Sequence, residues 1–153
     1  MQQSKNRYIP KYFVLEELLP PMMFTYDDMM APKHLQHGWA LIDQRLLVVL
    51  DVIRGEIIKE PLICNTWHMN GNRKFSGLRP DNCTVGASKS QHKLGKAADL
   101  LCYKYTAEQM RQMIIENQDL LPYPIRMEDG VAWLHIDVKD QEYKDQKIYL
   151  FKA

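Results

Sequence analysis

The sequence predicts an α+β fold built as a single domain over residues 1–153, in which a small antiparallel sheet has helices packed on one side. A chain of 153 residues is long enough to bury a core but too short for two full domains. Apolar residues recur at steps of three and four in the first half, which is typical of a helix, whereas alternating apolar segments gather after residue 97. Helices before and between late strands favour the α+β class.

Composition excludes several classes of protein. The 20 Lys and Arg residues nearly balance 19 Asp and Glu residues and form no long run, so no nucleic-acid partner is expected. No apolar stretch is long enough to cross a membrane, and the N-terminus has no apolar signal-peptide core. We therefore expect a monomer that is made in the cytoplasm and has no membrane partner. Any function outside the cell would require release by a route other than a signal peptide. Cys64, Cys83 and Cys102 form no CxxC pair, and a disulfide scaffold is not expected.

In the first half, the pattern predicts an N-terminal arm followed by one long helix. The arm covers residues 1–32 and contains a short helical turn that ends at Pro20-Pro21. An amphipathic stripe from about Lys33 to Ile57 predicts the main core helix. Residues 61–67 are apolar and follow a proline, which indicates a strand.

In the second half, strands flank a second helix. Residues 97–103 alternate as a strand does, and Thr106 with Gln109 forms a capping box before a helix that ends near Leu121. Residues 125–127 and 131–138 then predict a hairpin around the turn at residues 128–130, and residues 147–151 an edge strand.

Two segments carry histidines and carboxylates in a pattern that suits a metal. His92 and Asp99 are separated by Gly95 and two alanines, so a tight turn can bring the carboxylate back to the imidazole. In the last hairpin, Trp133, His135 and Asp137 share the face opposite the apolar residues. A lone strand histidine is more often a hydrogen-bonded structural residue, but two histidines with one aspartate form a three-ligand zinc set that leaves a position open for water.

These residues resemble a known signature. The pattern Ser90-x-His92-x-x-Gly95-x-Ala97-x-Asp99, followed by Trp133-x-His135, resembles the zinc signature of the D-Ala-D-Ala metallopeptidases, and the segment ending in Arg79 resembles the arginine-bearing segment upstream of it. The resemblance covers roughly residues 61–138. It implies that His92, Asp99 and His135 bind Zn²⁺ and that Arg79 faces the substrate.

The resemblance also implies a reaction. It is hydrolysis of a peptide bond in a peptidoglycan stem peptide, either by a D-Ala-D-Ala carboxypeptidase or by an endopeptidase. A compact member without a signal peptide is similar to phage endolysins, which act on the cell wall after release.

The general base is where the sequence departs from the best-known family pattern. That pattern has an acidic residue three positions before the last histidine, where this chain has Ala132. We expect Glu128 to be the base, because other members of the wider family resemble this chain in having a glutamate further upstream; Asp129 is the neighbour with which it could be confused. Asp137 is expected to orient a ligand histidine.

Further polar residues have less specific expectations. Ser90 would brace its loop by hydrogen bonding, Trp133 would face the cleft, and His68 could line it. His34 and His37 are expected to be solvated. The alternatives are a zinc-containing binding domain or phage structural domain of the same fold without turnover, and a phage structural protein without metal.

Overall fold

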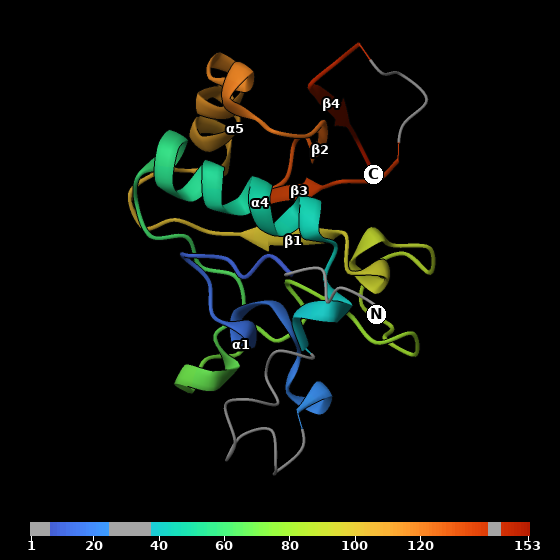
Figure 1. The fold of residues 1–153 in the computed structure, drawn as a ribbon. Coiled ribbons are helices and arrows are strands. Elements are labelled where there is room, and N and C mark those ends of the chain that lie inside the picture. The colour runs from blue at the N-terminus through green and yellow to red at the C-terminus, as the bar shows by residue number, and fades with distance from the viewer. Residues whose placement is uncertain (1–6, 25–37, 141–144) are drawn as a thin grey trace, which may run out of the picture.

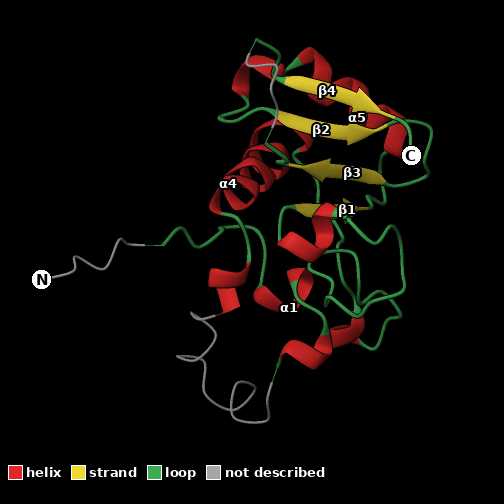
Figure 2. Cartoon of the chain, turned by 90° about the vertical axis from the view of Figure 1, so that its right-hand side faces the viewer, coloured by secondary structure: helices red, strands yellow, loops and turns green. Residues whose placement is uncertain are grey.

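A four-stranded mixed sheet organises the protein (Figure 2). The computed structural model describes residues 7–24, 38–140 and 145–153. The strands are β1 (Ala97–Leu100), β2 (Ile125–Glu128), β3 (Leu134–Asp137) and β4 (Ile148–Phe151), in the spatial order β1-β3-β2-β4. The α+β class is confirmed. The sheet differs in one detail, because β4 reverses relative to β3 and therefore runs parallel to β2, whereas the other pairs are antiparallel.

The two faces of the sheet have opposite character, as the alternation predicts. One face contributes buried apolar side chains to the core: Ala98, Leu100, Ile125, Met127, Leu134 and Ile136. Helices α4 (Gln44–Val52) and α5 (Ala107–Glu116) complete this core (Figure 1). The other face carries polar residues, which leaves it free to build a site.

Helix α4 begins later than the sequence predicts. Within the described residues, Trp39–Leu41 (η3) is a separate 3-10 turn, and Ile42 is extended. Asp43 then caps the helix, because its side chain accepts the N–H of Arg45 at 2.9 Å. The helix continues as a π-helical segment, Ile53–Ile58 (η4). The predicted start near residue 33 is therefore wrong.

The predicted strand at residues 61–67 is also wrong. Only Ile63 pairs with Leu101, through one isolated bridge. Pro61 has no N–H to donate, and the N–H of Asn65 donates to the carbonyl of Glu17 instead of to a neighbouring strand. The segment therefore turns towards the N-terminal arm, whose helix α1 (Leu15–Leu18) ends before Pro20.

The arm is docked, as expected. The Asp51 carboxylate on α4 accepts from the Tyr8 hydroxyl and from the N–H groups of Lys11 and Tyr12. Short 3-10 turns complete the described structure: Pro21–Met23 (η1), Trp67–Met69 (η5), Gln91–Leu94 (η6) and Gln118–Leu120 (η7). No helix of the described residues has the length and apolar composition needed to cross a membrane.

Candidate metal centre

Strand pairing brings Asp99 and His135 together. These residues face each other across β1 and β3, and because paired residues point to the same side of a sheet, both side chains lie on the polar face. His135 Nδ1 lies 2.8 Å from Asp99 Oδ1. Both side chains are largely buried, so their contact is shielded from water.

His92 reaches the same carboxylate from a short turn. Ser90 begins η6, and its hydroxyl accepts the N–H of His92 at 3.2 Å. Gly95 ends the turn at a φ of +68°, and a Cβ there would lie 2.0 Å from the carbonyl oxygen of Leu41. This conformation turns the chain directly into β1, and His92 Nε2 lies 3.2 Å from Asp99 Oδ1.

The outward nitrogens of both histidines have acceptors. His92 Nδ1 lies 2.8 Å from the carbonyl oxygen of Gly77, and His135 Nε2 lies 2.8 Å from Asp137 Oδ2. When each imidazole is neutral, these acceptors hold its proton on the outward nitrogen. The inward nitrogens are then available as electron-pair donors beside Asp99.

The carboxylates and His135 influence one another's ionisation in the metal-free protein. Burial raises the pKa of Asp99, but hydrogen bonds from His135 and His92 outweigh burial and lower it below the usual range. Burial lowers the pKa of His135, but hydrogen bonds to Asp137 and Asp99 raise it to about 9. The pKa of Asp137 is also lowered, because contacts with His135 and Arg126 outweigh its burial. Both carboxylates are therefore ionised at neutral pH, whereas His135 is protonated in the metal-free protein and would have to release a proton to bind a metal.

The three residues could hold a metal ion. One ligand atom from each of His92, Asp99 and His135 lies within 4.8 Å of the other two. Metal–ligand bonds of about 2.0–2.1 Å in a tetrahedron place ligand atoms about 3.3 Å apart. Asp99 Oδ1 lies 3.2 Å from His92 Nε2, close to this spacing, and 2.8 Å from His135 Nδ1, so Asp99 and His135 would have to separate slightly around an ion. The two histidines and the carboxylate are the donor set that a catalytic zinc site uses.

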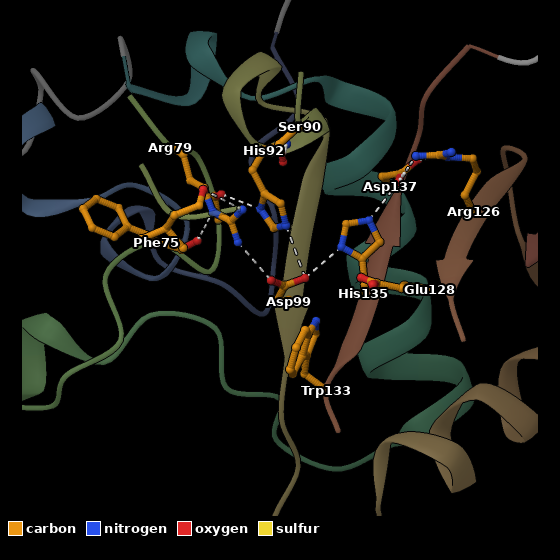
Figure 3. A network of polar contacts seen from close by, with 12 residues as sticks. Phe75, Arg79, Ser90, His92, Asp99, Arg126, Glu128, Trp133, His135 and Asp137 are labelled. Carbon is orange, nitrogen blue, oxygen red and sulfur yellow. Dashed lines mark hydrogen bonds and ion pairs between the residues drawn. The ribbon is translucent and has the colours of Figure 1, made fainter. Parts of the chain in front are cut away.

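The cluster opens onto a cavity of about 460 Å³ (Figure 3). Figure 3 shows Arg79 at one end of the cluster and Glu128 at the other. Trp133, which is 38% exposed, also lines this cavity. The site thus combines potential metal ligands, a further carboxylate and a cation around one space that can admit a ligand.

Arg79 is held by the protein and still borders the cavity. Its Nε donates to the carbonyl of Phe75 at 2.8 Å, and Nη2 lies 3.3 Å from Asp99 Oδ2. Nη1 makes a long contact of 3.5 Å with the carbonyl of Val85. Among the described residues these contacts use three of the five N–H groups of a guanidinium, so two can turn to a ligand.

The structure brings most of the predicted site residues together and separates two from them. The cavity is lined by Arg79, Ser90, His92, Asp99, Glu128, Trp133, His135 and Asp137. Asp129 does not line it, although its N–H donates to the carbonyl of Phe151. His68 does not line it either, because η5 places its ring against Trp67, so the expectation that His68 lines the cleft is wrong. His34 and His37 lie outside the described residues.

Sequence reasoning missed Arg126 and Phe151. Arg126 binds both oxygens of Asp137, at 2.8 and 2.9 Å, and its guanidinium lies 4.1 Å from the ring centre of Phe151. Both residues line the cavity. Alternation along β2 could have identified Arg126, because it shares a face with Glu128. No local sequence signal marks the carbonyl of Gly77 as a partner of His92.

The chain was also compared with known proteins. No family model, no curated protein and no solved structure matches it. Its function therefore has to be inferred from the residues and from the geometry of the site.

Proposed function

We propose that the protein is a zinc-dependent peptidase that hydrolyses peptide bonds in peptidoglycan stem peptides. The observation that carries this proposal is the convergence of His92, Asp99 and His135, with His92 Nε2 and His135 Nδ1 both beside Asp99 Oδ1, at a cavity that Glu128 and Arg79 also line. A buried structural ion pair needs no such cavity. A hydrolytic site needs both a place for substrate and groups that move protons and bind negative charge.

Zinc is the metal that the donor set favours. Imidazole nitrogens and one carboxylate suit zinc better than calcium or magnesium, which prefer oxygen ligands alone. Acceptors on the outward histidine nitrogens are the usual companions of zinc-bound histidines. Zinc would supply an acidified water and polarise the scissile carbonyl.

Glu128 and Arg79 would complete the chemistry. Glu128 would take a proton from the attacking water and deliver it to the departing amine, which is the role of a general base and then a general acid. Arg79 would use its two remaining N–H groups to bind a developing oxyanion or a substrate carboxylate.

The substrate class follows from the resemblance to the D-Ala-D-Ala metallopeptidases. The cut bond would be D-Ala-D-Ala in a carboxypeptidase or an internal bond in an endopeptidase. A phage lysin that reaches the cell wall after release is the biological setting that the resemblance favours.

The rival is a zinc-containing binding or phage structural domain that lacks turnover. Ala132 favours it, because the best-known family pattern has the base at that position. Glu128 lines the cavity, which weighs against the rival domain. A carboxylate that could act as the base is therefore present, although at a different position from that of the best-known family pattern.

Metal analysis is the first test. Protein purified without chelator is expected to contain about one zinc per chain. His92→Ala should lose it, whereas His68→Ala should keep it, because His68 lies outside the cavity. A wild-type protein without metal, even after incubation with zinc, would contradict the proposal.

Digestion of purified peptidoglycan is the second test. Mass analysis should detect released D-Ala from a carboxypeptidase or new internal termini from an endopeptidase. Glu128→Gln should retain zinc but lose about 10²–10⁴-fold in kcat. Asp129→Asn is its matched control and should remain active. Bound zinc without any cleavage by the wild type would favour the rival binding domain.

A further inference from the structure

Arg111 lies on helix α5, outside the cavity, and is buried with 4% of its surface exposed. Its guanidinium contacts three carbonyls of one short segment. The donors reach the carbonyl oxygens of Glu128 at 3.4 Å, Val131 at 3.1 Å and Trp133 at 3.2 Å. A buried arginine that binds both ends of a loop fixes its position, because the fork of N–H groups is rigid.

The loop itself, residues 129–133, has little other support. Ala132 is exposed and adds little packing, and Trp133, at 38% exposure, is only partly covered. A Cβ at Gly130 would meet no atom within 4 Å. A second anchor is the hydrogen bond of 2.8 Å from the N–H of Asp129 to the carbonyl of Phe151.

This loop connects two parts of the proposed site. Glu128, the proposed base, immediately precedes it, and His135 follows two residues after Trp133. Pairing of β2 with β3 and β4 already holds the backbone of Glu128. The arginine adds a direct tie between the strand end that carries the base and the residue before the strand that carries a ligand. A displacement of about 1 Å at such a site can reduce a rate about 10²-fold.

We propose that Arg111 is a positioning residue, which holds the loop at residues 129–133 from helix α5 and so places the Glu128 carboxylate relative to His92, Asp99 and His135. The kinetic consequence rests on the proposed peptidase function. The structural consequence, a loop held by Arg111, does not depend on it.

The ion pair with Glu108 provides a matched control. Glu108 Oε2 accepts from Arg111 Nε at 2.9 Å, whereas the three carbonyls accept from Nη1 and Nη2. Glu108→Gln removes that charge and leaves all three carbonyl contacts possible. If only the charge pair mattered, this variant would behave like a change at Arg111.

The experiment compares zinc-loaded wild type with Arg111→Gln, Arg111→Lys and Glu108→Gln. We expect Arg111→Gln to lower kcat about 10–100-fold with KM changed by no more than about twofold and one zinc per chain retained. Arg111→Lys should lie between this variant and wild type, because an ammonium can reach one carbonyl but cannot span three. Glu108→Gln should behave as wild type.

Hydrogen exchange of the metal-free proteins gives a second measurement that needs no activity. Amides in the peptide covering residues 128–134, that of Asp129 above all, should exchange faster in both Arg111 variants and at the wild-type rate in Glu108→Gln. Unchanged kcat with unchanged exchange would overturn the proposal. So would a fall in kcat that only follows zinc loss or unfolding.

The two proposals can fail separately. If the wild type cleaves no peptide, the proposed function fails, and exchange then decides alone whether Arg111 holds the loop. If the wild type is active and the Arg111 variants match it in both measurements, the proposed function stands and the role of Arg111 is wrong.

Discussion

The two halves of the candidate metal centre are built by different means. Asp99, His135 and Asp137 stand on β1 and β3, which we call the strand side. Arg79, Ser90 and His92 lie between residues 76 and 95, which we call the loop side. On the strand side one register, Asp99 opposite His135, fixes the ligands. On the loop side, the backbone that carries these residues is held by contacts that are distant in sequence.

Those distant contacts come from the N-terminal arm and from the segment before α4. The N–H of Leu78 donates to the carbonyl of Leu18 at 2.8 Å, and a Cβ at Gly77 would lie 2.3 Å from the same oxygen. The N–H of Asp43 donates to the carbonyl of Gly95 at 2.9 Å. The loop side is thus rigid only where other segments of the chain pack closely against it. The comparison teaches that the geometry of the loop side depends on tertiary contacts. The geometry of the strand side follows from sheet pairing.

Removing one ligand from each side should produce the largest effects. His92→Ala and His135→Ala should both lose zinc, with affinity reduced by more than the ~10–100-fold expected for an outer partner. The metal-free proteins should differ, because His135 lies between two buried carboxylates, Asp99 and Asp137. Breaking that network should lower the free energy of unfolding by about 3–5 kcal/mol.

The loss at His92 should be smaller, about 1–3 kcal/mol, because its ring contacts one carboxylate, Asp99, and one backbone carbonyl, that of Gly77. Zinc content by elemental analysis and urea denaturation of the metal-free variants measure both effects. Equal destabilisation by the two changes would contradict the distinction between the sides.

Two glycines test the tertiary contacts of the loop side directly. Gly95→Ala places a methyl group against the carbonyl of Leu41 and also strains a φ of +68°. We expect a loss of at least ~2 kcal/mol in the free energy of unfolding, since the left-handed backbone alone costs about 1–2 kcal/mol.

Gly130→Ala, in the loop between β2 and β3, is the matched control. Its φ is +79°, but a Cβ there meets no atom within 4 Å. It should lose only the backbone contribution, about 1 kcal/mol. Chemical denaturation of both variants measures the difference. A larger loss in the free energy of unfolding for Gly130→Ala than for Gly95→Ala would contradict the dependence of the loop side on close packing.

Asp137→Asn should weaken zinc binding without removing a ligand. Asp137 accepts from His135 Nε2 and from Arg126, so an amide would no longer hold the imidazole proton as firmly. Zinc affinity should fall ~10–100-fold, as is usual for an outer hydrogen-bond partner. Asp140→Asn is the control, because Asp140 is exposed and pairs with Arg45 and Lys96 instead. Competition with a chromogenic chelator measures the affinity, and equal values for both variants would exclude a role for Asp137.

The same distinction explains what could be predicted from the sequence. The faces of β1 and β3, with Asp99 and His135 on the polar side, follow from the two-residue period of a strand and are confirmed. The capping box at Thr106 and Gln109 is local and is also confirmed. Both depend on residues that are close in the sequence or that repeat regularly.

The errors lie where distant contacts decide the local conformation. The segment at residues 61–67 has a strand-like composition, but the N–H of Asn65 donates to Glu17, far away in the sequence. Helix α4 starts later than predicted, because Asp43 acts as its cap and the N–H of Asp43 donates to the carbonyl of Gly95. The small residues between His92 and Asp99 predicted that the two side chains meet, but not the outward partner of His92, which is a backbone carbonyl that no side chain marks.

Two helix caps give the smallest and most specific test. Ser90 on the loop side accepts the N–H of His92, and Thr106 at the start of α5, outside the site, accepts the N–H of Gln109 at 3.1 Å. Changing either to alanine should lower the free energy of unfolding by about 1 kcal/mol, because both remove a cap. Only Ser90→Ala should also weaken zinc binding, by a few-fold, since it loosens the turn that carries a ligand. The two variants therefore separate stability from metal binding. Equal zinc affinities of Ser90→Ala and Thr106→Ala at equal stability would show that η6 holds His92 in place without its cap. The contacts of Gly95 would then be sufficient to position the loop side.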